Sequence, residues 1–301
     1  MNPNINPGKR DRLWRGVVIY LPYAWLLLFF LAPFVIVFKI SFADPLLAQP
    51  PYSPLLDWTA DIGSRFLATL DNYGFLLEDK LYWVSYLRSI KIAFIATVLC
   101  LLLGFPMAYA IARTPYPWRN FLLLLVILPF WTSFLLRVYA WMIMLTKQGL
   151  INSLLMKIGL INDPLQMLYT NGAVYLGIVY TYVPFMILPL YATLEKLDLD
   201  LHDAAADLGA KPWQVFCDVT IPLARPGIIA GCLLVFIPAI GEYVIPALLG
   251  GLDSLMIGRT LYDEFFVNRD WPLASAVAIV LLFILILPIM LFQQQQQEPE
   301  S

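Results

Sequence analysis

The sequence predicts an all-α, polytopic membrane protein with six transmembrane helices. Hydrophobic residues make up 60% of the chain and charged residues 13%, whereas soluble domains contain about 45–50% and about 25%. The mean hydropathy is +0.75, and several apolar stretches reach the length of about 20 residues that a helix needs to cross a bilayer. The 19 basic and 21 acidic residues nearly balance, which argues against a basic surface for nucleic acid. Three cysteines in 301 residues exclude a secreted disulfide scaffold.

Residues 17–38 form the first predicted span, because they contain no charged residue and are long enough to cross the membrane. The preceding residues 1–16 are rich in arginine and lysine, a flank typical of the cytoplasmic side. A cleaved signal peptide is the alternative, because Ser41-Phe42-Ala43 resembles a cleavage site. The apolar region of a signal peptide has only about 7–15 residues, so we expect a retained first helix.

Five more apolar stretches complete a six-helix transmembrane domain at residues 17–292. An even number of spans puts both termini on one side, and the basic flank of the first span identifies that side as the cytoplasm. The fifth stretch contains Gly241 between Pro238 and Pro246, a combination that predicts a broken helix beside a transport pathway. The five stretches are residues 88–112, 121–145, 172–194, 226–249 and 273–292.

Two segments outside the spans have a distinct composition. The longest predicted external loop, residues 41–87, is rich in proline and acidic residues, and we expect short helices in it on the membrane surface. The carboxy-terminal residues 293–301 are a glutamine run with a polar end, which predicts a disordered cytoplasmic tail. The sequence contains no internal repeat, which weakens the case for a transporter built from two inverted halves.

The sequence indicates no catalytic, metal or nucleotide site. Residues 251–260 resemble a phosphate-binding loop only superficially, because their glycine spacing differs and Arg259 replaces the required lysine. His202 is the single histidine, and no cysteine pair has the spacing of metal ligands. Serine, histidine and acidic residues form no plausible triad. We therefore expect neither an enzyme nor a cofactor or metal, and energy for transport must come from an ion gradient or a separate ATPase.

The most informative segment is residues 195–225, between the fourth and fifth spans. Apolar residues recur in it at helical spacing, and Asp198 or Asp200 is suited to cap that helix. Gly209 would end the helix with a left-handed residue, and Pro212 suits the first turn of a second short helix. An ordinary loop needs no apolar face of its own. We therefore interpret residues 195–225, called the elbow below, as a cytoplasmic docking element made of two helices joined by a turn. The apolar positions are Leu197, Leu201, Ala204, Ala205 and Leu208.

The elbow resembles the "EAA" loop of ABC-importer permeases, which reads Glu-Ala-Ala, three residues, Gly, nine residues, then Ile-x-Leu-Pro. Here Asp203 replaces Glu, Val219 replaces Ile and Ile221 replaces Leu, while the glycine and proline spacing is kept. The resemblance implies that this loop binds the ATPase of an importer. The matching residues are Asp203, Ala204, Ala205, Gly209, Val219, Ile221 and Pro222.

Three other stretches are similar to polyamine-importer permeases, most of all to those of the putrescine type. They are residues 128–134, 137–141 and 241–246, and the similarity covers almost the whole chain up to Phe292. The resemblance implies an inner-membrane ABC-importer permease that moves putrescine or spermidine from the periplasm to the cytoplasm of a bacterium. It also implies three kinds of partner: a second homologous permease subunit, two copies of a cytoplasmic ATP-binding subunit, and a periplasmic polyamine-binding protein.

Arg137 and Glu242 lie at similar depth within the predicted third and fifth spans. A charge at bilayer depth costs at least ~2.5–3.5 kcal/mol, so it normally has a partner or faces water. Either the two residues form a structural ion pair, or Glu242 faces the pathway and attracts an ammonium group. The flanking aromatic residues either line that pathway through cation–π contacts or belong to the aromatic belt of the membrane interface. The predicted pathway residues are Glu242, Tyr243, Arg137, Tyr139, Trp141 and Trp131.

Other functions remain compatible with parts of this pattern. An ABC-importer permease for another small solute, such as an inorganic anion or an iron chelate, would share the fold. An ion-coupled secondary transporter would be equally apolar but would not need the docking loop, and a membrane enzyme fits least. The sequence does not separate putrescine from spermidine. The two differ by one aminopropyl unit, which is recognised by the binding protein and by the length of the cavity.

Overall fold

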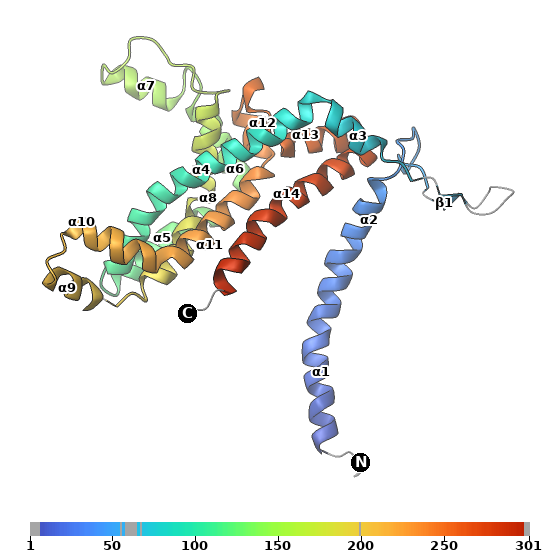
Figure 1. Ribbon diagram of the computed structural model, residues 1–301. Coiled ribbons are helices and arrows are strands. Elements are labelled where there is room, and N and C mark those ends of the chain that lie inside the picture. Colours follow the sequence, from blue (N-terminus) through green and yellow to red (C-terminus); the bar gives the residue numbers. More distant parts are fainter. Residues whose placement is uncertain (1–6, 55, 58–64, 67, 199, 298–301) are drawn as a thin grey trace. The chain divides into compact units, whose positions relative to one another are not determined.

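The computed structural model describes residues 7–54, 56–57, 65–66, 68–198 and 200–297, and it confirms the all-α class (Figure 1). A two-stranded antiparallel pair, β1 (Leu56–Asp57) and β2 (Arg65–Phe66), is the exception that the sequence did not predict. The chain divides into two compact units. One comprises Met1–Glu78 with Glu264–Leu282, and the other comprises Asp79–Asp263 with Phe283–Ser301.

The first unit contains the first span as one continuous helix. It consists of α1 (Pro7–Leu26), the π-helical turn η1 (Leu27–Leu31) and α2 (Ala32–Ile40), and residues Gly16–Ile40 are long and apolar enough to cross a membrane. Its large side chains, including Leu28 and Phe30, are exposed. An apolar helix without a buried face within its own chain is suited to contact lipid or another protein.

A short helix, α3 (Asp71–Glu78), is fastened to the end of α2. The side-chain amide of Asn72 donates to the carbonyl oxygens of Ser41 and Ala43 at 3.1 and 2.8 Å. The hydroxyls of Tyr73 and Ser41 are 2.7 Å apart. α3 is a short helix within the predicted external loop 41–87, whereas Asp61 and its neighbours 58–64 lie outside the described residues. The place of α3 on the membrane surface stays a prediction.

The second unit is built on three long helices that pack along one another: α4 (Lys80–Arg113), α8 (Asn171–Leu194) and α11 (Ile221–Ile240). Close packing depends on glycine, because a Cβ on Gly231 would lie 2.7 Å from Sδ of Met186. Small residues at such crossings let membrane helices approach and gain dispersion contacts. Met186, Ile187 and Leu190 of α8 are fully buried in this core.

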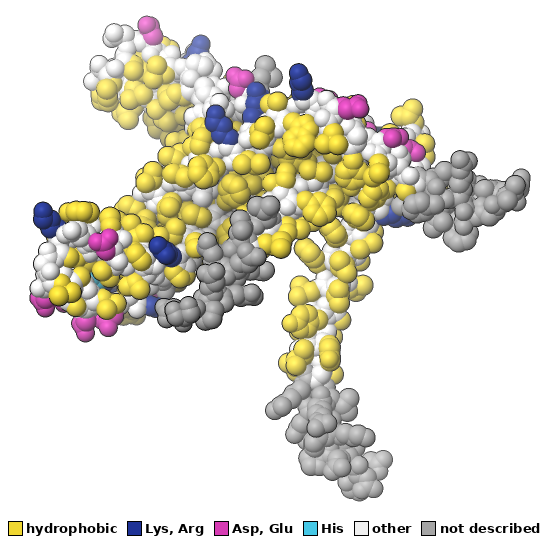
Figure 2. Space-filling model, in the orientation of Figure 1, with side chains coloured by type: hydrophobic (Ala, Val, Ile, Leu, Met, Phe, Trp, Pro, Cys, Tyr) yellow, Lys and Arg dark blue, Asp and Glu magenta, His cyan; other side chains and the backbone are white. Residues whose placement is uncertain are grey.

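Charged side chains gather at the two ends of this unit, and apolar side chains cover its middle (Figure 2). The charged ends lie at α9 (Asp200–Asp207) and near α7 (Leu150–Lys157). An apolar band between two charged ends is the surface that a bilayer requires. Five helices are long and apolar enough to span a membrane, or six if a bent pair counts as one span.

The bent pair corrects the prediction of a single span over residues 121–145. The structure instead has α5 (Trp118–Ile127), the 3-10 turn η2 (Leu128–Trp131) and α6 (Phe134–Met144), with a bend of 88° between the two parts. Thr132 is extended there (φ −101°, ψ 151°), and its hydroxyl donates to the carbonyl of Pro129 at 2.8 Å. Pro129 and this local bond compete with the helix ladder, so the helix stops.

The fifth span begins earlier and ends earlier than the predicted 226–249. A continuous helix runs from Pro212 to Ile240, through α10 (Pro212–Gln214), the π-helical turn η3 (Val215–Thr220) and α11. The break predicted at Gly241 is confirmed, because α11 ends at Ile240 and a separate helix, α12 (Val244–Leu249), follows.

The remaining elements follow α12. They are the 3-10 turn η4 (Leu252–Ser254), α13 (Ile257–Tyr262), the π-helical turn η5 (Asp263–Val267) and α14 (Trp271–Gln297). A disordered tail was expected from residue 293 onward, but α14 continues through the glutamine run to Gln297. Residues 298–301 lie outside the described part of the chain.

Candidate functional site

The carboxylate of Glu242 lies in the break between α11 and α12 and is only 7% exposed. Its Oε1 accepts the backbone N–H groups of Tyr243, Val244 and Ile245 at 3.2, 3.0 and 3.4 Å. Its Oε2 accepts the hydroxyl of Tyr182, from α8, at 2.5 Å. The side chain therefore satisfies the free N–H groups at the start of α12, as a capping residue does. The fold supplies this buried acid with its own donors.

The break is braced from the other side by α13. A Cβ on Gly258 would collide with the backbone carbonyl of Gly241, so only glycine lets α13 approach the break so closely. The hydroxyl of Ser89, on α4, accepts the N–H of Ile257 at 2.7 Å. The chain on both sides of Glu242 is thus fixed to the long helices of the second unit.

Arg137 and Glu242 form no ion pair among the described residues, so the structural pair that the sequence left open is not present. The guanidinium of Arg137 lies 5.9 Å from the ring centre of Phe130, and its buried Nε and Nη1 lack a hydrogen-bond partner in the described chain. Phe130 contacts Phe185 edge-on, and Phe185 contacts Tyr182. Three aromatic rings therefore connect the two charges.

The predicted pathway aromatics fall into two groups. Trp131 and Tyr139 are 74% and 44% exposed, as expected for contacts with lipid or a partner chain. Trp141 packs edge-on against Tyr180, and Tyr243 stacks on Tyr262 with ring centres 4.1 Å apart and planes within 15°. Among these four predicted aromatic residues, Tyr243 is the one whose backbone N–H is bonded to Glu242.

Sequence reasoning did not identify Tyr182 and Tyr262 as site residues. Tyr182 is 60 residues from Glu242 in the chain, and its hydroxyl is one of many in an aromatic-rich helix. No spacing rule connects residues on different helices. The buried acid itself was the available signal, because an uncompensated carboxylate in a span requires a donor from a neighbouring helix.

The elbow, residues 195–225, forms as predicted in its first half. Oδ1 of Asp198 accepts the N–H of Asp200 at 3.1 Å before α9. Gly209 has φ +86°, the left-handed conformation expected after a helix end. Pro212 occupies the first turn of the next helix. The second helix is not short, however, because it continues without interruption into the fifth span.

The elbow exposes large apolar side chains among its charged ones. Four large side chains are exposed there, namely Leu201, Leu208, Trp213 and Phe216, with Leu208 at 91%. Of the loop residues predicted from the sequence, Asp203, Ala204 and Gly209 are exposed, and Ala205, Val219, Ile221 and Pro222 are half-buried. Trp213 was missed, although a tryptophan beside Pro212 in a polar loop was a visible signal.

Behind the elbow, Arg119 fastens the ends of two long helices together. It forms a 2.7 Å ion pair with Glu195, which follows α8. It also donates to the carbonyls of Ala112 and Thr114, at the end of α4, at 3.2 and 3.1 Å. The elbow is thus connected to a braced region at the ends of α4 and α8.

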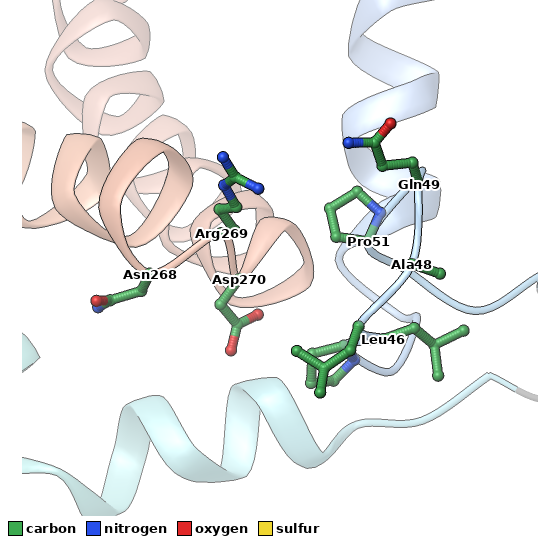
Figure 3. A pocket seen from close by; sticks show the side chains of 9 residues that line it. Leu46, Ala48, Gln49, Pro51, Asn268, Arg269 and Asp270 are labelled. Carbon is green, nitrogen blue, oxygen red and sulfur yellow. The ribbon is translucent and has the colours of Figure 1, made fainter.

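The first unit contains a cavity of about 670 Å³ that involves none of the predicted pathway residues. Figure 3 shows its two sides, a loop with Gln49 and Pro51 and a turn with Arg269 and Asp270. Oδ1 of Asp270 accepts the N–H of Leu273 at the start of α14. Burial, the largest cause, and the nearby Glu264 raise the pKa of Asp270, and the bond from Leu273 partly opposes them.

Comparison with known proteins gives a consistent family. Residues 100–298 match the family described as binding-protein-dependent transport system inner membrane component. The spermidine/putrescine transport system permease protein PotB of Escherichia coli (strain K12) is 42% identical over 262 residues, covering 86% of this chain and 90% of that protein. PotB of Haemophilus influenzae is 40% identical over 271 residues, covering 89% of each. The sequence motifs resembled the putrescine-type permease PotH, whereas these two relatives are PotB proteins.

Solved structures agree on the fold. A bacterial alginate ABC transporter, in complex with its alginate-bound periplasmic protein, contains a chain with a TM-score of 0.66 and 19% identity, and the match covers 96% of this chain and 95% of that one. The methionine ABC transporter MetNI in an inward-facing conformation gives a TM-score of 0.52 at 15% identity, covering 70% and 92%. At this level of identity the likeness concerns architecture alone.

Proposed function

Because the chain belongs to the family of binding-protein-dependent transport system inner membrane components, we propose that it is the permease subunit of an ATP-driven polyamine importer. The observation that carries the proposal is the 40–42% identity to spermidine/putrescine permeases over most of the chain. The chain is a membrane permease rather than an enzyme. Polyamines move in this proposal from the periplasm to the cytoplasm, with the amino terminus on the cytoplasmic side.

The elbow is proposed to bind the cytoplasmic ATPase. Leu208 and Trp213 would bury their exposed apolar surface in a groove of that partner. Two copies of the ATPase would serve two permeases, this chain and a second homologous subunit. A periplasmic polyamine-binding protein would deliver the cargo on the opposite side.

The proposed polyamine path passes the break at Glu242. Its Oε1 is occupied by backbone N–H groups, so an arriving ammonium group would meet Oε2 and share it with Tyr182. Tyr243 follows Glu242 in the chain and stacks on Tyr262, and this pair of rings would offer cation–π contacts. In this proposal Arg137 stands at the far side of the aromatic rings and repels cations from the protein interior.

Uptake by the reconstituted complex tests the proposal. Permease pair, ATPase and binding protein are placed in proteoliposomes, and radiolabelled putrescine and spermidine are supplied with and without enclosed ATP. Uptake that requires both ATP and the binding protein supports the proposal. Uptake driven by an ion gradient without ATP would instead identify a secondary transporter. ATP-dependent uptake of an inorganic anion or iron chelate, but of no polyamine, would contradict the assignment of polyamines as the substrate.

A further inference from the structure

His202, the one histidine of the chain, connects three helices inside the elbow. It lies on α9, and its Nε2 is 3.0 Å from Oγ1 of Thr220, the last residue of η3 before α11. The same nitrogen is 3.5 Å from Nη2 of Arg113, the last residue of α4. A single ring atom therefore reaches from the elbow helix to the ends of two of the three long core helices.

Both contacts of the ring are made by Nε2. Toward Arg113 this nitrogen can act only as an acceptor, because a guanidinium group can only donate. Toward Thr220 it can donate or accept, because a hydroxyl does both, and that hydroxyl also lies 3.5 Å from the carbonyl oxygen of Val215. Nδ1 is buried and has no hydrogen-bond partner in the described chain. The imidazole is thus held entirely through Nε2, and the position of that atom determines how α9 sits on the core.

The helix that carries His202 has little else to hold it inward. None of the residues of α9 is buried, and Leu201 and Leu208 point their apolar surface outward. At its end, α9 leads into Gly209, whose left-handed backbone gives a sharp turn. An exposed helix of eight residues gains little stability from its own hydrogen bonds. The polar link through His202 is therefore its specific side-chain connection to the core.

We infer that His202 is a positioning residue that makes the ends of α11 and α4 follow α9 when the ATPase moves the elbow. The inference rests on the proposed function, in which α9 binds an ATPase. His202 touches no transported solute and acts through Thr220 and Arg113. Without the link, α9 would act on the core mainly through its covalent connection to the helix that begins at Pro212.

Two substitutions of similar size separate this role from general packing. In His202→Gln the side-chain oxygen reaches the place of Nε2 and can still accept from Thr220 and Arg113. In His202→Asn the amide reaches only the place of Nδ1. We expect His202→Asn to lower uptake per ATP hydrolysed by about tenfold, the loss expected from a hydrogen bond to a charged group. His202→Gln should retain most of the wild-type ratio.

Thr220→Val tests the same contact from the other side, because valine keeps the shape and removes the hydroxyl. It should lower uptake per ATP several-fold, and the double variant with His202→Asn should be no worse than His202→Asn alone, since both remove one contact. Thr220→Val also decides the matter if His202→Asn fails to assemble with the ATPase. Equal uptake per ATP in wild type, His202→Asn and Thr220→Val would overturn the inference. Equal losses in the Asn and Gln variants would also overturn it.

A readout independent of cargo keeps the inference apart from the proposed substrate. Spin labels are placed at Asp207→Cys, on α9, and at Leu223→Cys, both at exposed positions, in a complex whose native cysteines are replaced. The distance between the labels should be the same without nucleotide and with trapped ATP, and it should change between these states in His202→Asn. If it stays constant in both proteins, the link has no mechanical role. If the distances behave as expected but polyamines are not transported, the inference about His202 holds and only the proposed substrate is wrong.

Discussion

The hydroxyl of Tyr182, on α8, donates to Oε2 of Glu242 at 2.5 Å, although the two residues are 60 positions apart in the chain. The other carboxylate oxygen holds three backbone N–H groups of the break. Glu242 therefore obtains its stabilisation from neutral donors and not from the cation Arg137. A carboxylate stabilised in this way keeps its net negative charge available to a cationic solute.

Glu242→Gln should reduce polyamine uptake about tenfold or more while the complex still assembles. The glutamine oxygen can accept the N–H groups of α12, but the negative charge that attracts an ammonium group is lost. The measurement is uptake in proteoliposomes, normalised to the amount of assembled complex. Tyr182→Phe is the matched control, since it keeps the ring and the charge, and it should cost only a few-fold.

The double variant Glu242→Gln with Arg137→Gln distinguishes the two roles of the acid. Because no ion pair joins these residues in the described chain, removing Arg137 should not restore uptake to Glu242→Gln. Recovery of both expression and uptake in the double variant would mean that neutralising Arg137 is the function of Glu242.

Gly209→Val should uncouple ATP hydrolysis from transport without blocking membrane insertion. Nothing lies within 4 Å of a Cβ at this position, so the cost arises from φ +86°. A left-handed backbone costs an L-residue about 1–2 kcal/mol, and a β-branched side chain suits it worst. Gly209→Asn tolerates this conformation and should remain close to wild type. If the Val variant had the wild-type ratio of uptake to ATP hydrolysed, the elbow would not take part in coupling ATP hydrolysis to transport.

Labelling of single cysteines should show the elbow and the α12–α13 connection on opposite sides of the membrane. With the native cysteines replaced, a membrane-impermeant thiol reagent added outside should react at Asp253→Cys but not at Asp207→Cys. Both side chains are exposed, so access to the reagent depends on the side of the membrane alone. External labelling at Asp207→Cys would reverse the proposed orientation.

Gly231→Ala should destabilise the core of the second unit. The added Cβ would lie 2.7 Å from Sδ of Met186 and 3.2 Å from its carbonyl oxygen, and overpacking typically costs about 1–3 kcal/mol. Thermal unfolding of the detergent-solubilised complex measures the effect. Gly74→Ala, in α3 with open space around it, should be neutral or slightly stabilising. A lower unfolding temperature in Gly74→Ala alone would contradict the packing argument.

Asp270 should make stability fall as the pH rises from about 4. Its pKa is raised by burial above the ordinary value of about 3.9, so the native state binds this proton more tightly than the unfolded state does. Its contribution is fully present below the unfolded pKa and is lost as the pH rises through the native pKa. Asp270→Asn keeps the acceptor for Leu273 and should flatten the pH dependence of the unfolding temperature. An unchanged slope would show that other groups cause it.

The sequence predicted those features of the fold that depend on local composition. The length of the apolar stretches predicted the membrane spans. Gly209 predicted a helix end and Gly241 a helix break, because the effect of a glycine acts within a few residues. The 88° bend at Thr132 was missed because Pro129 alone does not decide between a kink and a full break. Tyr182 was missed because its role depends on which helices become neighbours, and one sequence carries no direct signal for that.

The uninterrupted helix from Pro212 to Ile240 makes the elbow and the break two ends of one rigid lever. Its 29 residues correspond to about 43 Å at ~1.5 Å per residue, longer than the ~30 Å hydrocarbon core. The lever is therefore long enough to extend beyond the bilayer. By simple geometry on that length, a tilt of about 5° would displace the far end by ~4 Å, roughly the width of an aliphatic chain. If the elbow binds the ATPase as proposed, a small rotation at that surface would be enough to change the space around Glu242.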